Sequence, residues 1–67
     1  MSVAKVIEVI AESNSSWDDA AQNAVTEASK SVKNIKSLYA QDMQAVIENG
    51  KITTYRLNAK ITFVVND

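Results

Sequence analysis

The 67-residue chain contains no cysteine, no histidine, no proline and a single glycine. Without cysteine there are no disulfides and no thiolate metal sites. Without histidine, the most common general base and metal ligand is missing. Most catalytic templates need a nucleophile–base pair or a glycine-rich phosphate loop, and neither is visible. We therefore expect a binding or structural protein and not an enzyme.

The small size of the chain limits how it can be stabilised. Residues 1–67 are expected to form one domain. A domain of this length buries only roughly 60% of its unfolded surface, so its core is marginal. Small domains of this kind usually gain stability from disulfides, a metal or partner subunits. With disulfides excluded, the remaining routes are a homo-oligomer or a hard cation held by oxygen ligands. We favour the homo-oligomer.

The charge and hydropathy patterns exclude two classes of partner. The formal net charge is −1, from 7 basic and 8 acidic residues, whereas nucleic-acid-binding domains normally present a basic face. No apolar segment is long enough to span a bilayer, and residues 1–10 alternate in polarity, unlike the core of a signal peptide. The sequence predicts neither a nucleic acid nor a membrane as a partner, and a cytoplasmic location.

One segment, from Ser16 to about Val32, has the periodicity of an amphipathic helix. Ser16 and Asp19 form an S-x-x-D capping box at its start. We expect Asn34 to end the helix, because asparagine tolerates the left-handed conformation of a helix cap. The predicted apolar face consists of Trp17, Ala20, Ala21, Ala24, Val25, Ala28 and Val32.

The remaining segments are typical of strands. Val3 to Ala11 is apolar in both alternating sets, so we expect cover on both of its faces. Asn49-Gly50 is a strong signal for a type I′ turn and predicts a hairpin of two long strands. After the turn, one face is expected to hold Tyr55, Leu57, Ala59, Ile61, Phe63 and Val65.

Before the turn, the apolar alternation is interrupted by Gln41. We expect Tyr39, Met43, Ala45 and Ile47 to share the apolar face of the hairpin. The side chains expected to face away are Leu38, Ala40, Asp42, Gln44, Val46 and Glu48. The predicted fold is α+β: a single β-α-β-β unit, with a three-stranded antiparallel sheet packed on one helix and the last strand in the centre. The hairpin is longer than the helix, which also favours assembly.

Several short motifs follow one another along the whole chain: Lys5-Val6-Ile7-Glu8-Val9, Ser16-Trp17-Asp18-Asp19-Ala20, Asn23-Ala24-Val25, Glu27-Ala28-Ser29-Lys30-Ser31-Val32, Asn34-Ile35 and Lys60-Ile61-Thr62-Phe63. In this order they resemble the dodecins, a family of small β-α-β-β proteins. The resemblance implies twelve subunits in a hollow shell of cubic-group symmetry. It also implies storage of a small ligand without turnover. In flavin-binding members, pairs of flavins (FMN, riboflavin or FAD) stack on an aromatic side chain between subunits.

The chain departs from the flavin-binding pattern at the position of that aromatic residue. The tryptophan of the family corresponds to Ser37, and serine offers no π-face for an isoalloxazine ring. The flavin-contacting glutamine of the family corresponds to Arg56, and its glycine after the first strand to Ala11. Its acidic residue is kept as Asp42. The resemblance therefore places Ser37, Asp42 and Arg56 at the ligand site but weakens flavin as the ligand.

Three groups of residues have competing interpretations. Tyr39, on the same face as Ser37, and Trp17 could replace the stacking ring, or they could simply pack in the core or at an interface. Arg56 could bind a phosphate or a carboxylate, or it could pair with Asp42 or Glu48 across the hairpin or with a residue across a subunit interface.

The third group is the oxygen-rich segment 13–16, which with Asp18 and Asp19 could bind Ca²⁺ or Mg²⁺, or could simply cap the helix. The function predicted from the sequence is a non-enzymatic, homo-oligomeric protein, a hollow dodecamer, that binds and stores a small ligand. The alternative is a structural shell without flavin that holds cations.

Overall fold

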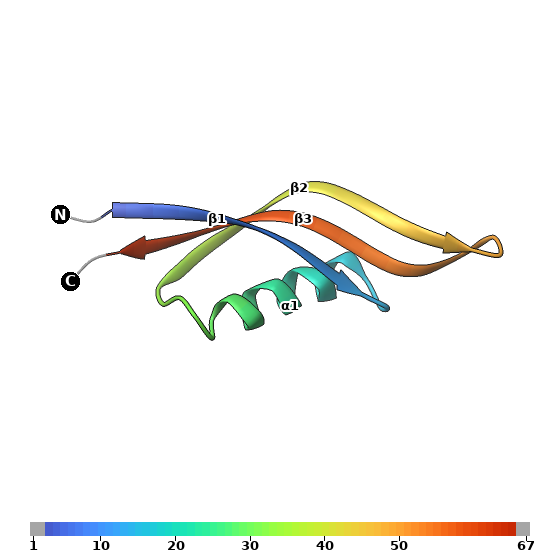
Figure 1. Ribbon diagram of the computed structural model, residues 1–67, viewed down its shortest axis with the longest axis horizontal. Helices are drawn as coiled ribbons and strands as arrows, with labels where there is room; N and C mark the ends of the chain where they lie inside the picture. The colour runs from blue at the N-terminus through green and yellow to red at the C-terminus, as the bar shows by residue number, and fades with distance from the viewer. Residues whose placement is uncertain (1–2, 66–67) are drawn as a thin grey trace.

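The computed structural model describes residues 3–65 and has the predicted β-α-β-β order (Figure 1). Its elements are β1 (Val3–Ser13), α1 (Trp17–Ala28), β2 (Ile35–Glu48) and β3 (Lys51–Val65). The three strands form one antiparallel sheet in the order β1-β3-β2, so the prediction that the last strand is central is confirmed. The ends of the predicted domain, residues 1–2 and 66–67, lie outside the described residues.

The helix starts where the capping motif predicted. Ser16 is extended, and its Oγ accepts a hydrogen bond from the Asp19 backbone N–H at 3.0 Å. The predicted end of the helix was wrong, because α1 stops at Ala28. Beyond it the backbone tightens to three-residue spacing, with the Ser31 N–H donating to the Ala28 carbonyl at 3.0 Å. Serine disfavours helix interiors because its hydroxyl competes for backbone groups. Asn34 does adopt a left-handed conformation (φ 64°), but in the connection to β2.

The turn between β2 and β3 also forms as predicted. Asn49 and Gly50 both have positive φ, 52° and 76°, as a type I′ turn requires. Glu48 is opposite Lys51 immediately before and after the turn. Two residues therefore join strands of 14 and 15 residues.

The face prediction for β2 was wrong in its first half. The register shifts between Ala40 and Asp42, so that Leu38 is opposite Ile61 whereas Met43 is opposite Leu57. An extra residue in a strand reverses the side-chain alternation beyond it. Leu38 therefore packs against the core, and Tyr39 lies on the other face, opposite Lys60 and 66% exposed.

The core lies between α1 and the centre of the sheet. Alanines on the helix let it approach β3 closely. The buried members of the core come from three elements: Ala11, Ala20, Ala24, Leu57, Ala59 and Ile61. The predicted apolar faces of α1 and β3 are thus confirmed at their centres. Half-buried side chains such as Ile7, Val9 and Leu38 extend the core to the flanking strands.

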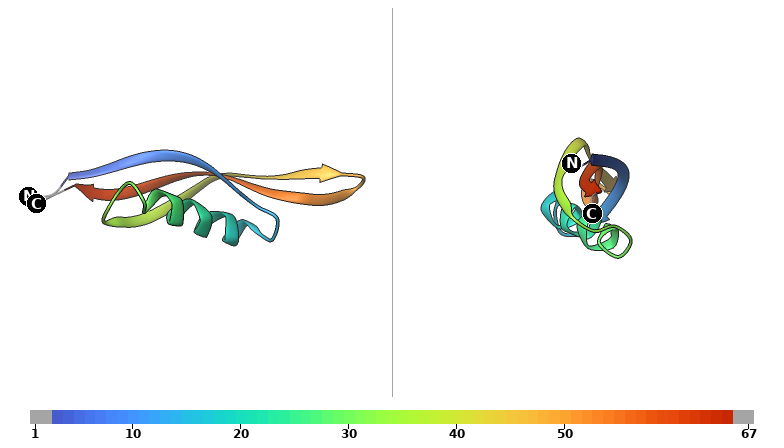
Figure 2. Two further views of the ribbon diagram at one scale, coloured as in Figure 1. Left: turned by 60° about the horizontal axis from the view of Figure 1, so that its bottom comes forward. Right: turned by 90° about the vertical axis from the view of Figure 1, so that its left-hand side faces the viewer.

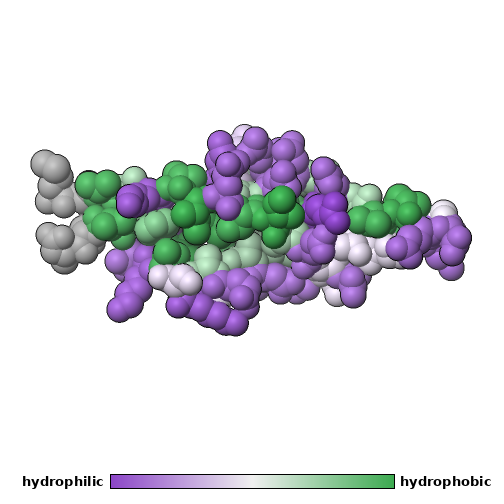
Figure 3. Space-filling view, viewed as in Figure 1, coloured by the Kyte–Doolittle hydropathy of each residue, from purple (hydrophilic) through white to green (hydrophobic). Residues whose placement is uncertain are grey.

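Large parts of the apolar surface have no cover within the subunit. The molecule is elongated, with extents of 52 × 19 × 13 Å, and the β2–β3 hairpin continues past α1 (Figure 2). Figure 3 shows an apolar strip along the long axis, bordered on both sides by hydrophilic residues. The expectation that β1 is covered on both faces does not hold within one subunit, because Val6 and Ile10 are 55% and 67% exposed. Within residues 3–65, no helix is long and apolar enough to cross a membrane.

Candidate functional site

The residues expected to line a flavin site all lie on the face of the sheet opposite α1. Ser37 is opposite Thr62, Tyr39 opposite Lys60 and Asp42 opposite Asn58. These partners alternate with the buried Ala59 and Ile61 along β3, so they point away from the helix. The prediction that Tyr39 shares a face with Ser37 is confirmed. We call this surface the helix-free face.

Along the helix-free face, these residues are too widely spaced to contact one small ring within a subunit. Thr62, opposite Ser37, lies six residues from Arg56, a separation of roughly 20 Å along a strand. Among residues 3–65, Tyr39 is the one exposed aromatic residue, and it lies between the rows of Ser37 and Asp42. A flavin bound on this face could therefore contact the exposed Tyr39 ring but no aromatic ring at position 37.

Arg56 pairs with a residue that the sequence prediction did not consider. Its Nε donates to Glu12 Oε2 at 2.6 Å, and Glu12 is directly opposite on β1. The predicted partners were Asp42 and Glu48 across the hairpin, but Arg56 is opposite Gln44 there. The pair is between one third and one half exposed, so it contributes little to stability. Its main effect is to hold the Glu12 carboxylate at the β1 end of the sheet.

Trp17 is part of the packing between helix and hairpin. Its ring lies edge-to-face on Tyr55, with centroids 4.9 Å apart and an interplanar angle of 78°. The indole N–H donates to the Gln44 carbonyl at 2.9 Å. Its ring and its donor are therefore both engaged inside the subunit, which supports the packing interpretation over a role in stacking a ligand.

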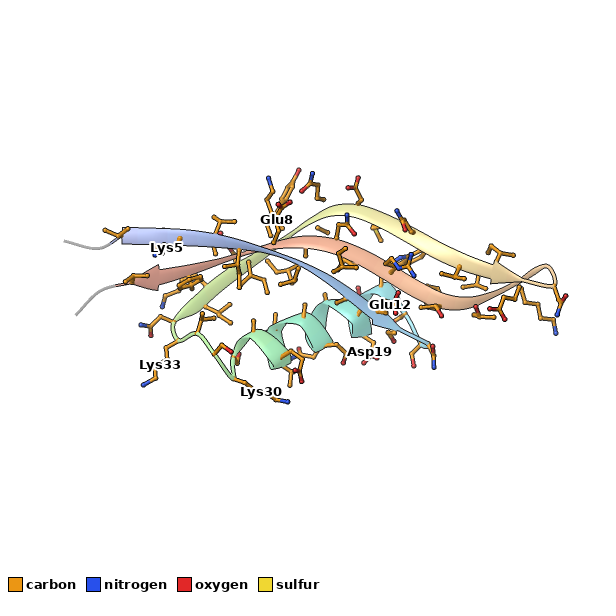
Figure 4. The ribbon with its side chains drawn as sticks, viewed as in Figure 1. Lys5, Glu8, Glu12, Asp19, Lys30 and Lys33 are labelled. Atoms are coloured by element: carbon orange, nitrogen blue, oxygen red, sulfur yellow. The ribbon has the colours of Figure 1, made fainter. Side chains whose placement is uncertain are left out.

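An oxygen-lined hollow of about 420 Å³ lies where β1 passes into α1. Glu12 and Asp19 are the acidic residues of its lining, and both are labelled near the start of α1 in Figure 4. The Glu12 carboxylate is at the same time bound by Arg56. Asp18, the other predicted metal ligand, is exposed on the first turn and does not line the hollow. The full lining is Glu12, Ser13, Asn14, Ser15, Asp19, Asn23 and Thr54.

Hydrogen bonds around Ser13 fix the shape of this hollow. The Ser13 side chain is buried, and its hydroxyl donates to Asp19 Oδ2 at 2.7 Å. Ser13 Oγ also accepts a hydrogen bond from the Ser15 backbone N–H at 2.9 Å. Asn23 donates from its side-chain amide to the Glu12 carbonyl at 3.0 Å. Ser13 therefore ties the loop to Asp19, and Asn23 ties α1 to the end of β1.

The oxygen atoms that line the hollow are of the kind that bind a hard cation, with low affinity. Ca²⁺ takes six to eight oxygen ligands, and the two carboxylates with the neutral oxygens of Asn14, Ser15 and Thr54 supply that donor type. Within residues 3–65, no group of three or more acidic side chains converges. The positive end of the helix dipole also opposes a cation here. Both facts argue against a tight cation site formed by these side chains within one subunit.

Sequence reasoning located the loop and Asp19 but missed Glu12 and Thr54. Both come from strands, and pairing of Ser13 with Tyr55 places the end of β1 beside Thr54. Glu12 could have been found as the last acidic residue before the oxygen-rich loop. Nothing in the sequence around Thr54 indicates that it lies near this loop.

Comparison with known proteins identifies the family. The dodecin family profile matches residues 3–66. Calcium dodecin from Mycobacterium tuberculosis is 46% identical over 65 residues, which cover 94% of this chain and 89% of that protein. A crystal structure of calcium dodecin from the same organism, described as calcium-chelating with a novel calcium-binding site, superimposes with a TM-score of 0.81. In that superposition the identity is 35%, over 96% of this chain and 91% of the other.

Other dodecin structures confirm the fold. Dodecin from Streptomyces coelicolor superimposes with a TM-score of 0.92 and 26% identity, over 98% of this chain and 94% of the other. A point variant of the Thermus thermophilus dodecin gives a TM-score of 0.93 at 18% identity over the full length of both chains. The profile, the relatives and the β-α-β-β fold agree, and the chain therefore belongs to the dodecin family of small, non-enzymatic ligand-binding proteins.

Proposed function

We propose that this protein is a homo-oligomeric dodecin that binds divalent cations, with Ca²⁺ as the ligand, in place of flavin. The observation that carries the proposal is the oxygen-lined hollow, whose charged lining residues are Asp19 and Glu12, the second of which also pairs with Arg56. It is supported by the 46% identity to a protein named calcium dodecin. The hollow dodecamer implied by the resemblance remains part of the proposal, because the subunit leaves much apolar surface uncovered.

A terbium titration tests cation binding directly. Tb³⁺ takes the same oxygen ligands as Ca²⁺, and Trp17, next to Ser16 and Asp18 in the chain, can sensitise its luminescence. We expect sensitised emission that Ca²⁺ displaces. Asp19→Asn and Glu12→Gln should each weaken binding by about tenfold or more, since affinity follows the number of charged ligands. Asp18→Asn should have a smaller effect, because Asp18 lies outside the hollow.

Asp42→Asn is the matched control, because it removes one carboxylate from the helix-free face and should leave the titration unchanged. Equal losses in all four variants would show a diffuse charge effect and contradict a site in this hollow. Absence of both sensitised emission and calorimetric heat with CaCl₂ would overturn cation binding altogether.

Flavin binding is the second candidate function. The resemblance to the dodecins implies a family with flavin-binding members, and Tyr39 is exposed near Ser37. We expect the parent protein to leave the fluorescence of added FMN unquenched. Ser37→Trp should restore a stacking surface and tighten FMN binding by about fivefold or more, the value of an aromatic contact of about 1 kcal/mol. Ser37→Leu is the control of similar bulk without the π-face. Strong quenching by the parent protein would contradict the loss of the flavin role.

A further inference from the structure

We propose that Asn49, at the tip of the β2–β3 hairpin, is a site of spontaneous deamidation in which the backbone nitrogen of Gly50 displaces the side-chain amide. The product is an aspartyl or isoaspartyl residue, so the modification adds a negative charge to a chain whose formal net charge is −1. Such a reaction needs an exposed asparagine, an unhindered nitrogen on the following residue, and a backbone that can leave its folded conformation.

The reacting groups of Asn49 and Gly50 are accessible and unengaged. Both residues are exposed. Glycine has no side chain to shield its backbone nitrogen, and a Cβ placed at Gly50 would meet no heavy atom within 4 Å beyond its chain neighbours. Neither the Gly50 N–H nor the Asn49 side-chain amide has a hydrogen-bond partner among residues 3–65. The nitrogen can therefore be approached by the neighbouring side chain and by water.

The tip of the hairpin is held by strand pairing and lies outside the buried core. Ile47 and Ile52 are opposite one another next to the turn, and the register shifts just before Ile47. These two side chains are 56% and 47% exposed, since the hairpin continues past α1 (Figure 2). Segments with few buried apolar contacts open locally at a low cost in free energy. Asn49 can therefore leave its left-handed conformation and reach the next nitrogen without unfolding of the core.

The other asparagines among residues 3–65 lack this combination. Asn14 is exposed, but the N–H of the residue after it donates to Ser13 Oγ at 2.9 Å. Asn34 precedes an isoleucine, whose branched side chain shields its own nitrogen. Two more lie within regular elements, whose backbone N–H groups are hydrogen-bonded: Asn23 and Asn58. We therefore expect Asn49 to react first among them.

The reaction consumes water and no other reagent. The Gly50 nitrogen bonds to Asn49 Cγ and passes its proton, through water, to the amide nitrogen. The Cγ–Nδ2 bond breaks, ammonia leaves, and a cyclic imide remains. Water then cleaves one of the two C–N bonds of the imide. Cleavage at Cγ leaves aspartate in a normal backbone, whereas cleavage at the backbone carbonyl leaves isoaspartate, with the former side chain in the main chain. Either product places a new carboxylate next to Glu48 in the chain.

The two products should affect the turn differently. Type I′ turns accept aspartate before glycine, so the aspartyl form should keep Glu48 paired with Lys51. The isoaspartyl form adds a methylene group to the main chain, and a two-residue connection of that length no longer matches the turn. We expect several-fold faster hydrogen exchange of the backbone amides next to the turn in the isoaspartyl form. Asn49→Asp should exchange as slowly as the parent protein.

Incubation of the purified protein at mildly alkaline pH, followed by tryptic peptide mapping, tests the modification. Trypsin releases residues 37–51, in which Asn49 is the only asparagine, and residues 6–30, which contain Asn14 and Asn23. We expect peptide 37–51 to gain the mass of an NH₂-to-OH replacement several-fold faster than peptide 6–30. The gain should be slower at mildly acidic pH, because the attacking nitrogen must lose its proton. Methyl transfer by an isoaspartyl methyltransferase should reveal the isoaspartyl form, and peptide 37–51 of Asn49→Asp should co-elute with the aspartyl form.

Gly50→Ala is the matched variant, because its methyl group shields the attacking nitrogen and should slow the modification several-fold. Circular dichroism checks its fold, since alanine is strained at a φ of 76°. Aspartate as the only product, formed at equal rates in the parent and in Gly50→Ala, would show direct hydrolysis and overturn attack by Gly50. A peptide 37–51 that stays unmodified in the folded protein would overturn the proposal, whether or not the same peptide reacts in urea.

Discussion

Replacing Trp17 by alanine is expected to lower the free energy of unfolding by about 3 kcal/mol, the lower end for a buried tryptophan because the ring is half-buried. The loss has two parts. The edge-to-face contact with Tyr55 disappears, and the Gln44 carbonyl loses its donor. The measurement is urea denaturation followed by circular dichroism, at one protein concentration, since association contributes to the stability of an oligomer.

Trp17→Phe separates these two contributions. Phenylalanine keeps an aromatic ring on Tyr55 but leaves the Gln44 carbonyl without its hydrogen bond, so we expect a loss of about 1 kcal/mol. If Trp17→Ala unfolds at the same urea concentration as the parent, the indole does not hold the start of α1 to the hairpin. In that case the hollow beside it would also lack a fixed wall.

Replacing Ile61 by alanine is expected to cost about 2–5 kcal/mol, measured by the same denaturation experiment. Ile61 is fully buried, on the central strand, between Ile7 of β1 and Leu38 of β2. Its truncation leaves a cavity in the core, at a row where all three strands pair. Ile61→Val removes a single methyl group and should cost about 0.5–1.5 kcal/mol.

Val65→Ala provides the matched control for this prediction, because Val65 lies on the same strand at its exposed end. A surface truncation of this kind should change stability by no more than about 0.5 kcal/mol. Equal losses at positions 61 and 65 would contradict a core centred on the middle of β3.

The two stability predictions bear on function through the position of the hollow. Glu12 and Asp19 come from different elements, and both line the hollow because β1 packs on β3 and α1 packs on both. The Arg56–Glu12 pair belongs to the same arrangement. A variant that loosens α1 should therefore weaken cation binding along with stability.

Features that depend on neighbours along the chain were predictable from the sequence. The serine cap at Ser16 and the turn at Asn49-Gly50 form as predicted, because a hydroxyl three residues from its donor and positive φ at two residues are local requirements. The strict alternation of β3 identified the central strand and its buried face. The resemblance to the dodecins was also contained in the order of short motifs.

Only the tertiary structure determined the features that depend on pairing between distant segments. The register shift at Gln41 moved Leu38 into the core and Tyr39 out of it, because β2 must follow the twist and spacing of β3. Glu12 reached Arg56 and the hollow through strand pairing across 44 positions of sequence. The connection after α1 is fixed to the sheet by a hydrogen bond from the Val64 N–H to the Asn34 carbonyl, 30 positions apart in sequence. Local pattern therefore determined which elements form, and pairing between them determined which side chains meet.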